Sequence, residues 1–135
     1  MKKPHDPAYT RVEGCIFCEM PSDRVDHRGN AVFAIRDKYP VTAGHTLVIP
    51  HRHVSKAMNL DDVEFLETMT VARKITSNLM AEDGSISGFN FGYNQSKVAG
   101  QTVDHAHFHI IPRRDGDVED PIGGIRGVIP DKRRY

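Results

Sequence analysis

The stretch His105-Ala106-His107-Phe108-His109-Ile110-Ile111 alternates imidazoles with apolar side chains before it becomes fully apolar. In an extended strand, side chains two positions apart face the same way. The pattern therefore predicts a strand over residues 105–111, with its three histidines on one face and Ala106, Phe108 and Ile110 directed into a core. Neighbouring histidines would stand ~6.5 Å apart along this strand, close enough for adjacent rings to act on one group together.

Further strands are predicted upstream of this stretch. Residues 24–27 and 31–35 are joined by Gly29-Asn30 and have the composition of a β-hairpin. Residues 45–49 are short, largely apolar and closed by a proline, which is typical of a central strand. Residues 89–94 alternate aromatic with small polar side chains, the period of a strand with one apolar face.

One amphipathic helix is predicted over residues 61–80. Asp61 as N-cap and Glu64 three positions later have the spacing of a capping box, and Asp83-Gly84 ends the segment. Its apolar face would carry Phe65, Met69, Ala72, Ile75 and Leu79. Hairpin-connected strands around one helix favour an α+β fold with an antiparallel sheet over a doubly wound parallel fold.

Length and charge limit the classes of function. The 135 residues suit a single domain spanning 1–135, with 1–14 as a flexible lead-in and 114–135 as a C-terminal loop or tail. Lys+Arg and Asp+Glu balance at 18 each, so no positive field would recruit nucleic acid. No apolar run approaches the ~20 residues of a membrane span. With no secretion signal in view, the expected location is cytoplasmic.

The eight histidines call for a chemical explanation, because most lie in or beside predicted strands. An imidazole with a pKa of about 6.5 is mostly neutral at neutral pH and needs no separate base to attack phosphorus. Attack by His107 would give a phosphoramidate whose P–N bond is readily hydrolysed, which amounts to a two-step displacement. Two alternatives are a solvated strand face and a metal site, since His-x-His is also a ligand spacing.

Cys15 and Cys18 have the spacing of half a tetrahedral zinc site. One alternative is a thioredoxin-like redox pair, but the βαβ pattern that surrounds such a pair is missing. Another is two buried cysteines that act as small hydrophobic residues. Zinc is the preferred interpretation. The remaining histidines, His5, His27 and His51, are expected at the surface.

The segment Gly100-Gln101-Thr102-Val103-Asp104-His105-Ala106-His107-Phe108-His109-Ile110-Ile111-Pro112 closely resembles the signature of the histidine triad (HIT) superfamily. The segment Gly44-His45-Thr46-Leu47-Val48-Ile49-Pro50, Asp37 and Asn94 add to the resemblance, which covers roughly residues 14–115. The Gly-Gln-Thr-Val form before the triad resembles the dinucleoside polyphosphate hydrolase (Fhit-like) branch, which is the preferred one, whereas the Cys pair and short chain are similar to small bacterial and Hint-like members. The resemblance implies a five-stranded antiparallel sheet with one main helix and a shorter helical segment. It also implies a homodimer in which the sheets of two subunits join.

The resemblance also implies a role for individual residues. His107 would carry the nucleotide, His109 would contact the phosphate, and His45 and His105 would complete the histidine set. Asp37 would hold the ribose hydroxyls, which can both donate to one carboxylate. The positions matched to phosphate or bridging oxygens are Asn94, Gln101 and Thr102, and an adenine slot is expected near Phe17 and Phe33.

A zinc site of four protein ligands is implied as well. Cys-bearing members that this sequence resembles complete such a site with the positions of His53 and His105. All four ligands would then be protein groups, so the zinc would be structural and no position would remain for a metal-bound hydroxide. No organic cofactor is expected.

Three functions are compatible with these patterns. The first is a nucleotide hydrolase or transferase that cleaves at the α-phosphate of AMP-containing dinucleoside polyphosphates or nucleoside phosphoramidates. Residues 114–135, which follow the triad directly, would then lie over the leaving group and set specificity. The second is a non-catalytic nucleotide-binding or scaffold dimer, which an intact His107 disfavours. The third is a metal hydrolase with the three histidines as zinc ligands.

Overall fold

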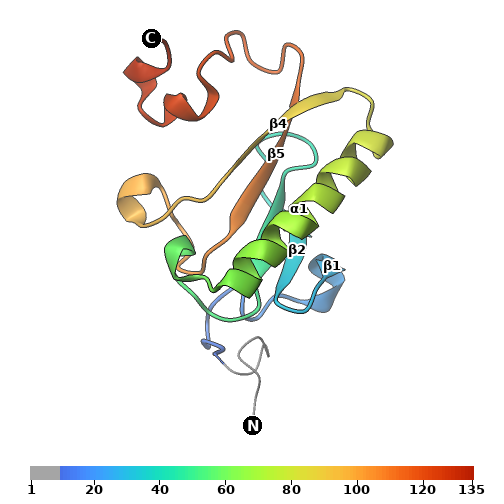
Figure 1. The fold of residues 1–135 in the computed structure, drawn as a ribbon, viewed down its shortest axis with the longest axis vertical. Coiled ribbons are helices and arrows are strands. Elements are labelled where there is room, and N and C mark those ends of the chain that lie inside the picture. Colours follow the sequence, from blue (N-terminus) through green and yellow to red (C-terminus); the bar gives the residue numbers. More distant parts are fainter. Residues whose placement is uncertain (1–9) are drawn as a thin grey trace.

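Five antiparallel strands form one sheet in the order β1-β2-β3-β5-β4, with one long helix lying across it (Figure 1). The computed structural model describes residues 10–135. The strands are β1 (Val25–Arg28), β2 (Val32–Arg36), β3 (Thr46–Pro50), β4 (Ile86–Gly92) and β5 (Phe108–Arg114), and the helix is α1 (Asp62–Glu82). This arrangement confirms the predicted α+β fold. None of the helices in residues 10–135 has the length and apolar composition to cross a bilayer.

Both faces of the central strands are covered, which explains why β2 and β3 are almost wholly apolar. On one face, α1 buries a layer that includes Val32, Val48 and Phe108. On the other face, the segment around Phe17 covers Phe33 and Leu47. We call this second face the histidine face, because His109 pairs with Leu47 across β3 and β5 and shares its side of the sheet.

The start of α1 is determined locally. Asp61 accepts a hydrogen bond from the Glu64 N–H, and the Glu64 side chain accepts one from the Asp61 N–H, which confirms the predicted capping box. Glu64 is fully buried and is compensated by an ion pair with Arg52 at 2.7 Å. The predicted apolar face is correct for Ala72 and Leu79, which are buried, whereas Phe65 is 41% exposed.

The predicted strand over residues 105–111 is wrong at its start, because β5 begins only at Phe108. Val48 pairs with Phe108, so Ala106 falls opposite Pro50, which has no N–H to donate to a neighbouring strand. The Ala106 N–H donates instead to the Val54 carbonyl at 2.7 Å. His105 and His107 therefore lie in an irregular segment that leads into β5.

Other predicted boundaries differ by small amounts. The strands β1, β2 and β3 each begin and end one residue later than predicted, and β4 covers 86–92 rather than 89–94. His51 is buried and stacked on Phe33, with ring centroids 5.3 Å apart, so its predicted surface position is wrong. His5 and most of the predicted lead-in lie in residues 1–9, outside the described residues.

Residues 115–135 leave the end of β5 and contain only short 3₁₀ helices, among them Gly124–Val128 (Figure 1). Asp117 forms an ion pair with Arg113 of β5, which ties the start of the segment to the end of the sheet. Asp120 pairs with Arg133 and Arg134 near the C-terminus, and these ion pairs lie within the segment itself.

Candidate active site and candidate metal centre

Three histidine rings cluster on the histidine face. The ring centroids of His107 and His109 are 5.0 Å apart, and those of His45 and His109 are 5.2 Å apart. His109 lies in β5, and His107 is the residue just before this strand. His45 is the residue just before the neighbouring strand β3. The adjacency of β3 and β5 therefore brings His45 to residues more than sixty positions away.

The hydrogen bond of His107 determines which of its nitrogens is free. Its Nδ1 lies 2.8 Å from the His105 carbonyl oxygen. A carbonyl only accepts, so the proton of a neutral His107 is assigned to Nδ1 and Nε2 keeps its lone pair. His107 is 8% exposed and lines an open cavity. The geometry supplies a nucleophilic nitrogen without a separate base.

A chain of hydrogen bonds leaves His109 with a free N–H, whereas His107 has a free lone pair. The Val41 N–H donates to Nδ1 of His45 at 3.1 Å, so the proton of His45 is on Nε2. This Nε2 lies 2.9 Å from Nδ1 of His109, which must accept and so carries its own proton on Nε2. His109 Nε2 is the one buried side-chain nitrogen or oxygen without a hydrogen-bond partner in residues 10–135. A buried N–H without an acceptor suits a site for an anionic oxygen.

Burial favours the neutral form of the His45 and His109 rings. The pKa of His109 is lowered to about 4, mainly by burial and to a smaller extent by the neighbouring rings of His107 and His45. Burial also lowers the pKa of His45, although the Asp37 carboxylate, 3.5 Å from its Nε2, opposes this shift. At neutral pH, His45 therefore donates to His109 as an uncharged imidazole.

A cavity of about 520 Å³, here called the first cavity, opens beside His107. Asp37 and Thr102 line it, as does Phe17. Sequence reasoning missed most of its apolar wall, which includes Ile16, Met20, Ile35, Leu47 and Val103. The only available signal was the position of Ile16 between the two cysteines. Phe33 does not line this cavity; it is buried in the core beneath His51 and borders a separate cavity.

The residues expected to contact phosphate oxygens have different positions. The Gln101 amide donates to the carbonyls of Ser55 and Val103 and accepts from the Ser96 N–H, so its polar atoms already serve the loop before His105. Asn94 is exposed beside Gly100, and Thr102 is exposed at the first cavity. Of the three predicted residues, Thr102 is the one that faces the cavity of His107.

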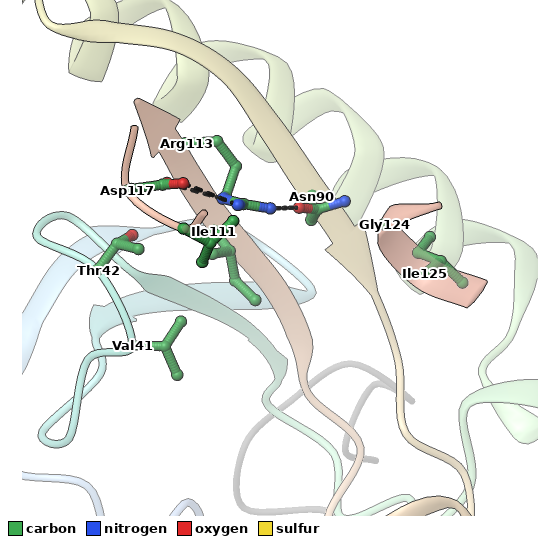
Figure 2. Close-up of a pocket in the computed structure, with 9 residues that line it drawn as sticks. Val41, Thr42, Asn90, Ile111, Arg113, Asp117, Gly124 and Ile125 are labelled. Carbon is green, nitrogen blue, oxygen red and sulfur yellow. Dashed lines mark hydrogen bonds and ion pairs between the residues drawn. The ribbon is translucent and has the colours of Figure 1, made fainter. Parts of the chain in front are cut away.

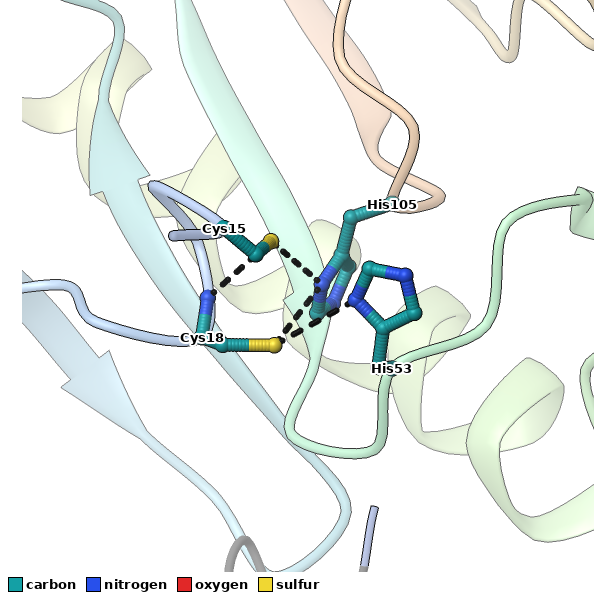
Figure 3. Close-up of side chains that lie close together, drawn as sticks. All are labelled: Cys15, Cys18, His53 and His105. Carbon is teal, nitrogen blue, oxygen red and sulfur yellow. Dashed lines mark hydrogen bonds between the residues drawn. The ribbon is translucent and has the colours of Figure 1, made fainter. Parts of the chain in front are cut away.

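A second cluster contains the predicted metal ligands Cys15, Cys18, His53 and His105, whose ligand atoms all lie within 4.8 Å of one another (Figure 3). Cys15 Sγ is 3.4 Å from His105 Nδ1, and Cys18 Sγ is 3.3 Å from His53 Nδ1. Ligands at zinc's tetrahedral bond lengths would be separated by about 3.6 Å between sulfur and nitrogen. His105 donates from Nε2 to the Pro50 carbonyl at 2.8 Å, which leaves its Nδ1 lone pair for a metal.

The same chemistry argues against the three histidines as joint metal ligands. His107 belongs to neither of the metal-compatible groups among the described residues. The other group contains Asp37, His45 and His109. In this group, His45 Nε2 and His109 Nδ1 are 2.9 Å apart and already joined by a hydrogen bond. The cysteine-containing cluster is therefore the candidate metal centre, and it is separate from the free nitrogen of His107.

The sheet, the helix and the paired histidines define a small α+β protein of the histidine triad class. The HIT domain family matches residues 19–116, and the chain belongs to this family. A HIT-like protein of Borreliella burgdorferi is 40% identical, covering 76% of this chain and 78% of that protein. The AP-4-A phosphorylase of Mycobacterium tuberculosis is 36% identical, covering 96% of this chain and 69% of that protein.

Two further similarities extend the comparison. An adenosine 5'-monophosphoramidase of Candida albicans is 32% identical, covering 75% of this chain and 71% of that protein. The crystal structure of a zinc-bound histidine triad family protein from Mycobacterium smegmatis superposes with a TM-score of 0.72 at 31% identity. The superposition covers 79% of this chain and 80% of the Mycobacterium smegmatis chain.

Proposed function

We propose that this protein is a nucleotide hydrolase or transferase that cleaves at the α-phosphate of dinucleoside polyphosphates or nucleoside phosphoramidates. The observation that carries the proposal is the pairing of His107, whose Nε2 has a free lone pair, with the unpartnered buried N–H of His109. A nucleophile and an oxyanion donor side by side are what a two-step phosphoryl displacement requires. Relatives named AP-4-A phosphorylase and adenosine 5'-monophosphoramidase support the same class of activity.

In the first step, His107 Nε2 forms a bond to the α-phosphorus. The bond from phosphorus to the leaving oxygen or amine nitrogen breaks, and its electron pair departs with the leaving group, which takes up a proton from solvent. The Nδ1 proton of His107 stays on the ring, bonded to the His105 carbonyl. The ring in the intermediate is therefore a cation.

In the second step, water attacks the phosphorus and the P–N bond breaks. Because the ring already carries its Nδ1 proton, it leaves as neutral imidazole and needs no further proton. The proton lost by water passes to solvent, and a nucleoside monophosphate is released. His109 Nε2–H would donate to a phosphate oxygen in both steps, and the proton of His45 fixes that donor.

The first cavity is the proposed site of the nucleoside. Asp37 would accept from the ribose hydroxyls, and Thr102 would contact the phosphate. Ile16 and Phe17 offer an apolar wall for a purine, and the names of the relatives favour an AMP-containing nucleotide as the substrate. Phe33 has no part in this site, and we assign Gln101 to positioning of the loop before His105 rather than to phosphate contact.

The four ligands Cys15, Cys18, His53 and His105 would hold a structural zinc ion. The ion would crosslink the N-terminal segment to His105, which lies two positions before His107. Phe17 lies between the two cysteines, so zinc would also hold the wall of the first cavity in place. Thiolate ligands of this kind stay reduced in the cytoplasm, which is the compartment we propose.

We also propose that two copies associate through β4 and the neighbouring part of α1. β4 is an edge strand, and its Phe91 is 42% exposed on the helix side of the sheet. Phe65 and Leu66 at the start of α1 are 41% and 69% exposed. A second copy would extend the sheet and bury these apolar side chains.

Rapid alkaline quench of the enzyme with labelled diadenosine tetraphosphate tests the mechanism. Nucleotide should remain on His107, in an acid-labile linkage, and His107→Ala should form no adduct. Full turnover by His107→Ala would contradict the mechanism. Tight nucleotide binding by the wild type without any turnover would indicate a non-catalytic binding protein instead.

A further inference from the structure

A second cavity of about 360 Å³ lies beside β5 (Figure 2). It is on the histidine face, further along β5 than His107 and His109. Ile111 and Arg113 line it, two and four residues beyond His109, so all three side chains project from the same side of β5. Asn90 lies opposite Ile111 on β4. The tail contributes Asp117 and Ile125 to the wall of this open cavity.

One short loop separates the two cavities. Asp37, Lys38 and Tyr39 line the first cavity, whereas Val41 and Thr42 line the second. The Val41 N–H also begins the chain of hydrogen bonds through His45. The His45–His109 pair therefore stands between a cavity on the His107 side and a cavity on the Arg113 side.

The polar chemistry of the second cavity centres on Arg113. Its Nε and Nη2 each donate to a different Asp117 carboxylate oxygen at 2.8 Å, and its Nη1 donates to the Asn90 side-chain oxygen at 2.7 Å. This guanidinium holds the pKa of the Asp117 carboxyl well below its usual range. A phosphate presents the same pair of oxygens to a guanidinium as a carboxylate does. Arg113 is thus arranged to bind an anion, and Asp117 occupies that place.

The rest of the wall is apolar. Val41 and Ile125 are 66% and 65% exposed, and they face the cavity together with Ile111 (Figure 2). Exposed aliphatic side chains beside an arginine suit a ligand with a flat apolar part and an anionic part. A nucleoside joined to a phosphate chain has this composition.

We propose that the second cavity binds the leaving half of a dinucleoside polyphosphate, with Arg113 on one of its phosphates and its nucleoside against Ile111 and Ile125. The inference rests on the proposed function, since it requires the α-phosphate at His107. The four residue steps from His109 to Arg113 span ~14 Å of strand. A polyphosphate with its nucleoside extends over such a distance, whereas the amine released from a phosphoramidate does not. The second cavity would therefore favour long leaving groups.

The experiment measures kcat/KM for diadenosine tetraphosphate and for adenosine phosphoramidate, and compares the ratio of the two values between variants. Arg113→Gln should lower this ratio about ten-fold, the loss expected for one charged hydrogen-bonding partner. Asp117→Asn should raise the ratio, because it removes the competing carboxylate while the arginine remains. Thermal unfolding of each variant checks that the fold is intact.

Arg114→Gln is the matched control. Arg114 is the next residue of β5, and it pairs with Asp83 rather than lining the second cavity. The variant removes the same charge and should leave the ratio unchanged. A ratio for Arg113→Gln within two-fold of the wild type, or an equal shift in Arg114→Gln, would overturn the subsite. If the ratio were unchanged but the His107 adduct formed normally, only the subsite would fail. A wild type that forms no adduct would refute the proposed function itself.

Discussion

The Nε2 atom of His45 lies 2.9 Å from the Nδ1 atom of His109, and this contact determines which side of His109 carries a proton. The backbone N–H of Val41 occupies the other nitrogen of His45. The proton of His45 must therefore point to His109, whose own proton is left to face outward without a partner. A pair of neutral rings thus acts as a fixed hydrogen-bond donor.

Removal of this donor should slow the reaction. We expect His109→Ala to lower kcat about 100-fold, the usual cost of losing one oxyanion donor. His109→Gln, whose amide N–H can still donate, should retain more activity. His45→Ala should have a smaller effect, since it acts through His109. The measurement is steady-state kinetics with diadenosine tetraphosphate, and near-normal kcat in His109→Ala would contradict the assignment.

The stability of the protein should fall in mild acid. The pKa of His109 is lowered to about 4 in the folded state, against about 6.5 in the unfolded chain. Between these values the unfolded state binds more protons, so the free energy of unfolding decreases as the pH falls from 6.5 through 4. Urea unfolding of the wild type at pH 7, 5.5 and 4.5 should show this decline. In a His109→Asn variant, the free energy of unfolding should decline less steeply with falling pH. An identical slope would argue against His109 as a source of this pH dependence.

Metal removal should affect both stability and nucleotide binding. Because zinc would join Cys15 and Cys18 to His105, chelation should lower Tm by about 5 °C or more. Nucleotide affinity should fall too, since Phe17 lies between the cysteines. Metal analysis should find one zinc per chain in the wild type and in a His107→Ala, His109→Ala double variant, but none in Cys15→Ser. Loss of zinc in the double variant would instead favour the histidines as ligands.

Association through α1 and β4 predicts that a charge at this surface gives monomers. Leu66→Asp introduces a carboxylate on α1, at a side chain that is already 69% exposed and adds little to the fold of one chain. Light scattering after gel filtration should report a dimer for the wild type and a monomer for this variant. Val98→Asp, at a residue that is 98% exposed in the short 3₁₀ helix Lys97–Ala99, is the matched control and should remain dimeric. A dimeric Leu66→Asp would place the interface elsewhere.

Features with local causes were predictable from the sequence. The capping box of Asp61 and Glu64 depends on residues three positions apart, and the strands follow from short runs that are apolar or alternate with a period of two. The histidine spacing predicted that His107 and His109 share one face, and their ring centroids are 5.0 Å apart, although His107 lies just before the strand rather than in it.

Features with distant causes required the tertiary structure. β5 starts at Phe108 because Pro50 of a neighbouring strand cannot donate, and Gln101 serves a loop because Ser55 folds against it. Phe17 and Phe33 look equivalent in sequence, yet only Phe17 lines the first cavity. The protonated nitrogens of His45 and His109 depend on partners that the sheet brings together. Local sequence specifies elements and spacing, while the partners of each polar atom are determined only when distant segments meet.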